Sequence, residues 1–109
     1  MKRILVTGAL VTALAAVLPA AAATPVFKGT VGPGFTIVMA SKPKVAGLTK
    51  IVINDKADDH NFHLTGPGVN VKTSVSAIGT KTFTVKLKKG TYKFVCDPHL
   101  FMKGSFTIK

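Results

Sequence analysis

The sequence of 109 residues contains a single cysteine, Cys96, so no disulfide can form within one chain. Its only arginine is Arg3, and the lack of arginine elsewhere argues against nucleic-acid binding, because recognition of phosphates and bases relies on that side chain. No segment shows the hydrophobic period of an amphipathic helix. No Ser-His-Asp set or catalytic carboxylate pair is apparent either, so the sequence does not predict an enzyme. These absences leave a small, non-helical protein that a metal or self-association must stabilise in place of disulfides.

Residues 1–23 have the layout of a secretory signal. A basic start is followed by the apolar residues 4–18 and then by small residues that suit a signal peptidase. The apolar stretch is too short to remain as a comfortable membrane anchor. We therefore expect cleavage after Ala23 and no stable membrane insertion. The mature protein would be exported to the periplasm or the extracellular space as one domain, residues 24–109.

Positive charge dominates the chain. The formal net charge is +11, and removal of Lys2 and Arg3 with the signal would lower it to +9. A strongly basic exported domain suits a partner with an acidic surface. A coat of lysines that only aids solubility is the alternative, and the sequence leaves both open. The sequence gives no sign of self-association, and we expect a monomer.

Alternation of apolar and polar residues is the main structural signal. In "KTFTVKLKK" Phe83, Val85 and Leu87 share one face, and "GTYKFVC" and "GSFTIK" repeat the pattern. The segments "GFTIVM", "TKIVIND" and "HNFHL" are also strand-like, and turns such as "VGPG" and "KKG" separate the runs. The stretch 64–81 is expected to be a long, partly irregular crossing. The sequence predicts an all-β antiparallel sandwich of six to eight short strands.

Three side chains near the C-terminus share an affinity for soft metals. Cys96 ends a predicted strand on its inward face, and Pro98 then stops the strand and forms a tight loop. That loop carries His99 and Met102. Taken alone, a cysteine and a histidine at this spacing are more often a buried small residue and a surface histidine. The convergence of a thiolate, an imidazole and a thioether instead indicates a metal site.

A second histidine ligand is available in "DDHNFHL". In an extended strand His60 and His63 point to opposite faces, because they lie three residues apart. His60 shares its face with Phe62 and Leu64, the apolar side. We therefore predict that His60 points into the site, whereas His63 is a solvated surface histidine.

The predicted ligands are His60, Cys96, His99 and Met102. Two imidazoles, one thiolate and a weak thioether form the donor set of electron-transferring copper sites. Zinc also accepts cysteine and histidine, although a structural zinc site rarely recruits methionine. We expect one copper ion per chain.

The motifs "HNFHLTGPGV" and "GTYKFVCDPHLFMKGSFTI" resemble those of the cupredoxins, small copper proteins of the plastocyanin, amicyanin and pseudoazurin group. The likeness runs from about residue 32 to residue 108, and it is closest to exported bacterial single-domain members. It implies a Greek-key sandwich in which His60, Cys96 and His99 bind copper in one plane with Met102 axial. It further implies that Asn61 joins the two ligand-bearing segments by hydrogen bonds.

Two functions follow from such a site. The first is a carrier of single electrons between a donor and an acceptor protein, with the ring edge of His99 as the exit and a possible apolar docking patch of Pro67, Leu100 and Phe101. The second is a module for copper storage, delivery or resistance. A structural or adhesive sandwich without a functional metal is a third interpretation. The spectrum of the copper-loaded protein and the ease of copper loss discriminate among them.

Overall fold

The computed structural model describes residues 7–9, 12 and 23–109 of the chain. The predicted secretory signal, residues 1–23, falls almost wholly outside these residues. Within the described part of the chain, no helix has the length and apolar character needed to cross a membrane.

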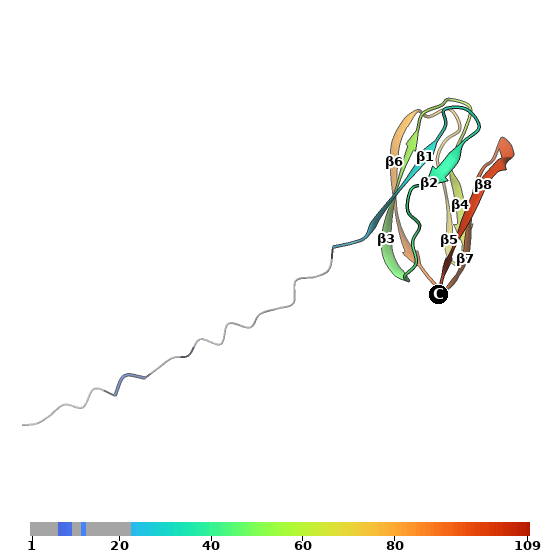
Figure 1. Ribbon diagram of the computed structural model, residues 1–109. Helices are drawn as coiled ribbons and strands as arrows, with labels where there is room; N and C mark the ends of the chain where they lie inside the picture. Colours follow the sequence, from blue (N-terminus) through green and yellow to red (C-terminus); the bar gives the residue numbers. More distant parts are fainter. Residues whose placement is uncertain (1–6, 10–11, 13–22) are drawn as a thin grey trace, which may run out of the picture.

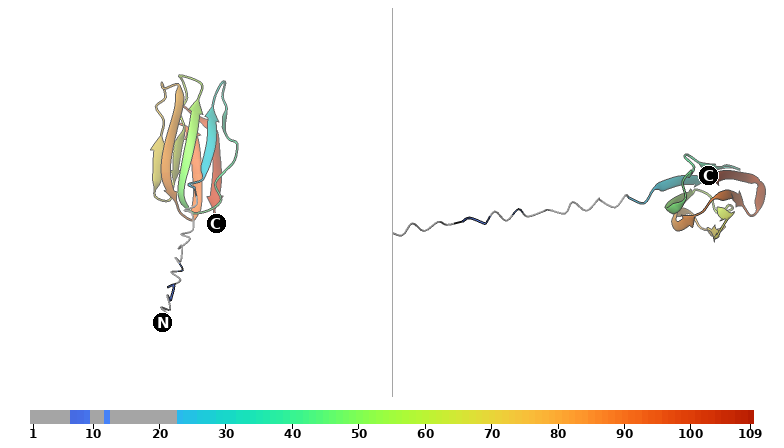
Figure 2. Two further views of the ribbon diagram at one scale, coloured as in Figure 1. Left: turned by 90° about the vertical axis from the view of Figure 1, so that its left-hand side faces the viewer. Right: turned by 90° about the horizontal axis from the view of Figure 1, so that it is seen from below.

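Residues 26–108 form eight strands in two four-stranded sheets that face each other (Figure 1). The first sheet has the order β2-β1-β3-β6, with bounds Ile37–Met39, Val26–Val31, Gly47–Asp55 and Gly79–Leu87. The second has the order β5-β4-β7-β8, with bounds Val69–Lys72, His63–Gly66, Gly90–Cys96 and His99–Ile108. Figure 2 shows the two layers along and across the strands. The predicted all-β sandwich is confirmed.

The core lies between the sheets and follows the predicted alternation. In β7 the side chains of Tyr92, Phe94 and Cys96 are buried, while Lys93 between them is exposed. Phe94 stacks on Phe62 with ring centroids 5.2 Å apart. Because Phe62 and Phe94 are each two positions from a predicted metal ligand, this aromatic pair supports the segments that carry the site.

The structure differs from the sequence prediction in three respects. Strands β1 and β5 were not among the predicted segments, and β4 and β5 form an antiparallel hairpin inside the stretch expected to be a long crossing. The sheets are also not purely antiparallel, since β1 pairs with β3 in parallel. The reason is that β2 folds back on β1 and the next loop returns the chain to the other side of β1. Alternation within one strand carries no information about this order.

A buried carboxylate at the end of β3 provides a stability prediction. Asp55 is 2% exposed; its Oδ1 accepts the N–H of Ala57 at 3.0 Å, and its Oδ2 has no partner among the described residues. Burial is the largest cause of the raised pKa of Asp55. A raised folded pKa means a stabilising contribution that is complete below the ordinary pKa and lost as the pH rises through the folded pKa. The ionised carboxylate therefore destabilises the fold at neutral pH.

Asp55→Asn should accordingly raise the free energy of unfolding of the apoprotein at pH 7 by about 1 kcal/mol. Urea titrations at pH 7 and at about pH 3.5, below the ordinary pKa of aspartate, should show the gain only at the higher pH. Asp58→Asn, an exposed neighbour, should change stability by no more than about 0.5 kcal/mol. A loss of stability in Asp55→Asn at pH 7 would contradict the interpretation.

Candidate metal centre

The loop after β7 delivers two of the predicted ligands together. Residues 97–98 form a two-residue turn, and Cys96 pairs with His99 across it. The next pair along the ladder is Val95 with Lys103, so residues 100–102 are extra on the β8 side. Cys96 and His99 lie side by side before this bulge, and the bulge turns Met102 inward. The burial of Met102 shows this, since residues 100 and 101 are exposed.

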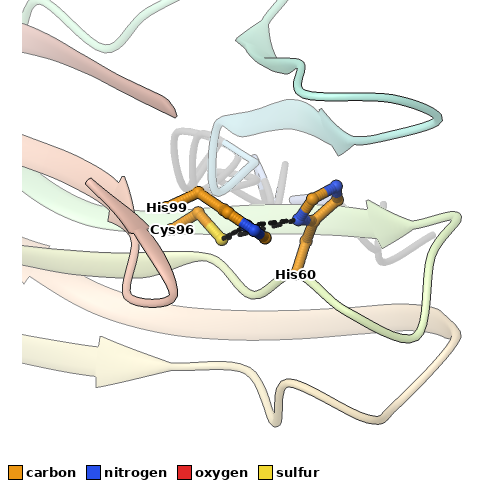
Figure 3. Close-up of side chains that lie close together, drawn as sticks. All are labelled: His60, Cys96 and His99. Carbon is orange, nitrogen blue, oxygen red and sulfur yellow. Dashed lines mark hydrogen bonds between the residues drawn. The ribbon is translucent and has the colours of Figure 1, made fainter. Parts of the chain in front are cut away.

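His60 reaches the same place from the loop between β3 and β4, and Figure 3 shows its ring facing Cys96 and His99. Its side chain is 2% exposed and Cys96 is fully buried, while His99 is half-buried. The two Nδ1 atoms of the histidines lie 3.0 Å apart, and each lies 3.7 Å from the Cys96 sulfur. His60 therefore joins Cys96 and His99, and His63 does not.

The oxygen acceptors around His60 lie at its outer nitrogen, Nε2, so its inner nitrogen, Nδ1, is available to a cation. Its Nε2 lies 2.8 Å from the carbonyl oxygen of Gly34 and 3.5 Å from Oδ1 of Asp59. Both are acceptors, so the Nε2–H donates to them, and Nδ1 on the other side of the ring faces Cys96 and His99, where its lone pair would bind a metal ion. A carbonyl that fixes the far nitrogen in this way is the usual outer partner of a metal-bound histidine.

The distances from the Cys96 sulfur to the two histidine nitrogens match one small metal ion bound at trigonal angles, while the 3.0 Å between the nitrogens requires a narrower angle between those two bonds. Typical bond lengths are about 2.0 Å to imidazole nitrogen and about 2.3 Å to thiolate sulfur. Such bonds at trigonal angles would separate sulfur from nitrogen by about 3.7 Å, which is the spacing found on both sides of Cys96. A thiolate with two imidazoles suits copper, and the donor set therefore fits that metal.

Met102 is 2% exposed and belongs to the same buried cluster as Cys96. It lies three residues after His99 on β8, at the end of the bulge. All four residues of the predicted ligand set are thus in the interior or at its edge, at the same end of the sandwich.

An apolar surface surrounds the half-buried His99. The ring of Phe35 lies edge-on to His99 at 5.0 Å, and Phe101 lies 5.9 Å from His99 on another side. Phe35, Leu100 and Phe101 are 62%, 67% and 67% exposed. We call these three residues the aromatic rim, after its two phenylalanines. Phe35 had no sequence signal beyond its place in a glycine-rich turn, and it was not predicted.

Pro67 does not belong to this surface. It lies in the β4–β5 turn, where its carbonyl oxygen accepts the hydroxyl of Tyr92 at 2.9 Å and its ring faces Gly90. Gly90 begins β7 and Cys96 ends it, so Pro67 is at the opposite end of the strands from the site. The predicted patch of Pro67, Leu100 and Phe101 is corrected in this respect. The hairpin that the sequence did not reveal carries Pro67 away.

Comparison with known proteins agrees with the geometry. The family model for copper-binding proteins of the plastocyanin/azurin family matches residues 21–109. The chain belongs to this family. Copper is thus the cofactor of its fold family, and one copper ion fits the donor set described above.

Three relatives of this cupredoxin are between 19% and 36% identical to it over the matched segments. Amicyanin-alpha of Methylorubrum extorquens is 36% identical over 67 residues, a segment that spans 59% of this chain and 56% of that protein. The structure of rusticyanin from Thiobacillus ferrooxidans has a TM-score of 0.58 at 20% identity and covers 81% of this chain and 79% of that one. Reduced auracyanin from Roseiflexus castenholzii gives 0.55 at 19%, covering 82% and 99%. At these identities the two structures support the fold alone.

A hydrogen-bonded network outside the cupredoxin's donor atoms joins its two ligand-bearing segments. Asn61 follows His60, and its Oδ1 accepts the backbone N–H of Asp97 at 2.8 Å. Its Nδ2 donates to Oδ2 of Asp97 at 2.8 Å and to the carbonyl of Thr73 at 3.3 Å. The hydrogen bonds implied for Asn61 by the family resemblance are therefore present. Asn61 hydrogen-bonds to Asp97 twice, once through the main chain and once through the side chain of Asp97.

His63 belongs to this network and is not simply solvated. Its Nδ1 donates to Oδ1 of Asp97 at 2.8 Å and its Nε2 faces Oδ1 of Asn70 at 2.7 Å. The hydrogen bond to Asp97, followed by that to Asn70, raises the pKa of His63. The hydrogen bonds from Asn61 and then from His63 lower the pKa of Asp97. The sequence prediction of an outward His63 is correct in direction, because the side chain is 22% exposed, but it missed these partners.

Proposed function

We propose that this protein is a soluble carrier of single electrons, with one copper ion bound by His60, Cys96 and His99 and more weakly by Met102. The observation that carries the proposal is the convergence of two imidazole nitrogens and one buried sulfur within 3.7 Å of one another. Bound copper would supply the chemistry by alternating between Cu(I) and Cu(II).

The protein's own contribution is a site that is held in place before the metal arrives. Cys96 and His99 sit on paired strands, and the Nε2 proton of His60 is anchored on the Gly34 carbonyl. Because one anchor is the paired backbone of β7 and β8 and the other is the Gly34 carbonyl in the β1–β2 loop, two separate segments hold the donor atoms, which need to move little when the charge at the site changes. A small rearrangement is the requirement for rapid electron transfer, and it supports the carrier over a storage module.

The aromatic rim supports His99 as the point of electron exit. His99 is the half-buried donor residue, and its ring contacts Phe35 and Phe101, whose rings lie 5.5 Å apart at the surface. A small exposed apolar surface suits brief encounters with a redox protein. We further propose that the donor and acceptor carry acidic surfaces, that residues 1–23 are removed on export, and that the mature domain, residues 24–109, works outside the cytoplasm as a monomer without enzymatic activity of its own.

Titration of the purified apoprotein with Cu(II) tests the proposal. One equivalent should produce an intense visible thiolate-to-copper absorption and a paramagnetic resonance signal with narrow copper hyperfine splitting, both lost on reduction and restored on oxidation. Copper should also raise the melting temperature, since binding to the folded state alone stabilises it.

Two outcomes decide between the candidate functions. A colourless product without the narrow hyperfine signal would overturn the copper carrier. Rapid loss of copper to a mild chelator from a coloured protein would favour storage or delivery. Zn(II) serves as the control, because it fits the same donors without absorbing visible light or changing its oxidation state.

A further inference from the structure

His63 bridges three segments of the sandwich next to the metal centre. It begins β4, its Nε2 contacts Asn70 on β5, and its Nδ1 contacts Asp97 in the turn that follows Cys96. Asp97 is the residue directly after the predicted thiolate ligand. The ring of His63 therefore connects to the Cys96 segment through one side chain and makes no contact with the donor atoms themselves.

The partners of His63 fix its charge. A carboxylate oxygen and an amide oxygen only accept hydrogen bonds, so both ring nitrogens must carry a proton for both short contacts, 2.8 and 2.7 Å, to be made. The ring is then an imidazolium. The hydrogen bonds to Asp97 and then to Asn70 raise the pKa of His63, and those from Asn61 and then from His63 lower the pKa of Asp97.

The carboxylate of Asp97 is fully occupied in this arrangement. Oδ2 accepts from Asn61 and Oδ1 accepts from His63, while the Asp97 backbone N–H donates back to Asn61. The Asp97 side chain is therefore held in one position, on the residue that is bonded directly to Cys96. The side chain is 40% exposed, so water partly screens its negative charge, but the charge would still act on a metal bound by the neighbouring Cys96 at short range.

We propose that His63 is a positioning residue that neutralises the Asp97 carboxylate beside the Cys96 thiolate and thereby sets the redox equilibrium of the copper. This inference rests on the proposed function. An uncompensated carboxylate would favour the more positive Cu(II) state, whereas the imidazolium cancels it. Loss of the His63 charge should therefore lower the reduction potential.

The other charged side chains that face His63, apart from Asp97, are lysines. Lys72 lies directly opposite it on β5, and the further lysines that face this region are Lys93 of β7, Lys103 of β8 and Lys81 of β6. Lysines lose their proton only near pH 10. Between about pH 6 and pH 9 a change in charge within this cluster therefore belongs to His63.

The test compares reduction potentials of copper-loaded variants as a function of pH. At pH 6, His63→Gln should shift the redox equilibrium about tenfold toward Cu(II), which is about 59 mV for one electron. The difference from the unmodified protein should shrink as the pH rises through the pKa of His63, because the unmodified protein then loses the same charge.

Lys72→Gln is the matched control. It removes one positive charge from the register partner of His63 and breaks none of the hydrogen bonds of the network. Its shift should be less than half that of His63→Gln and should not change with pH. Asp97→Asn tests the pairing itself: without the carboxylate, the pH at which the effect of His63→Gln disappears should move down toward the ordinary histidine pKa.

The apoprotein gives an independent readout. The ring resonances of His63 followed by nuclear magnetic resonance should titrate above the ordinary histidine pKa, and the Asp97→Asn variant should titrate near it. Should His63→Gln fail to fold, Asn70→Leu removes one acceptor without changing charge, and the step in potential should move to lower pH.

Two results would overturn the inference: a potential difference that is the same at pH 6 and pH 9, or a His63→Gln shift equal to that of Lys72→Gln. A third contrary result would be an Asn70→Leu variant in which the change in potential still occurs at the same pH as in the unmodified protein. These outcomes are separate from failure of the proposed function, in which the unmodified protein would give no coloured copper complex at all, while the resonance titration would still report the charge of His63.

Discussion

Cys96→Ser should abolish the visible absorption and the narrow hyperfine signal of the copper-loaded protein and weaken copper binding by more than about 100-fold. Even outer partners of metal ligands contribute 10 to 100-fold to affinity, and the thiolate is expected to bind the metal directly. A serine hydroxyl is a hard, protonated donor at neutral pH and is a poor substitute for a soft thiolate.

The variant should nevertheless fold, which makes the result interpretable. Serine is smaller than cysteine, and at the same position its hydroxyl has the Nδ1 atoms of His60 and His99 as hydrogen-bond partners, which lie 3.7 Å from the present sulfur. The melting temperature of the Cys96→Ser apoprotein should therefore stay within a few degrees of that of the unmodified apoprotein.

Isothermal titration with Cu(II), together with the visible spectrum, measures the effect. Lys103→Gln is a matched control, since this exposed side chain stands on β8 opposite Val95 and should leave the absorption unchanged. If Cys96→Ser retained the coloured complex, the Cys96 sulfur could not be a ligand of the copper. The full burial of Cys96 already argues against its use as an exposed redox thiol.

The sequence predicted those parts of the site that depend on local geometry. Period-two alternation predicted the inward side chain of Cys96, and Pro98 the end of its strand. The choice of His60 over His63 was correct, but its premise was not: β4 begins only at His63, and residues 60–62 lie in the preceding loop with Asn61 buried as well. The inferences about Cys96 and Pro98 use residues within a few positions of one another, where the geometry of a strand or a turn leaves few alternatives.

The parts that were missed depend on contacts between distant segments. Gly34 and Phe35 reach the site from the β1–β2 loop, and nothing in "VGPGF" distinguishes a turn that covers a histidine from any other turn. Pro67 was misplaced for the same reason, because the β4–β5 hairpin decides which end of the sandwich it occupies. The partners of His63 come from β5 and from the turn after β7, and only the strand order brings them together.

Gly104→Ala should produce a large loss of stability in the folded domain. Gly104 lies on β8 directly opposite Phe94 of β7, and the Phe94 ring covers it. A Cβ atom at this position would overlap the ring, with Cε2 only 2.6 Å away. Because Gly104 is not among the glycines with positive φ, the cost is steric and does not come from backbone strain.

The ring has little freedom to move aside. Phe94 is 2% exposed and stacks on Phe62, which is fully buried. Displacing Phe94 would therefore disturb Phe62 and the adjacent Asn61, as well as Cys96 two residues further along β7. We expect the free energy of unfolding to fall by about 3 kcal/mol, the upper end of the cost of overpacking a core. In a domain of this size that corresponds to a melting temperature lower by at least about 12 °C.

Thermal and urea unfolding of the apoprotein measure this loss without any contribution from copper. Ser105→Ala is the matched control, because it adds no atoms at an exposed neighbouring position and should change stability by less than about 0.5 kcal/mol. Combining Gly104→Ala with Phe94→Leu should cost less than the sum of the two single changes, since the smaller side chain makes room for the new methyl group. Additive costs, or a loss below about 1 kcal/mol for Gly104→Ala alone, would show that the ring relaxes freely. In that case the Phe62–Phe94 stack could not be what holds the Cys96 and His60 segments in place.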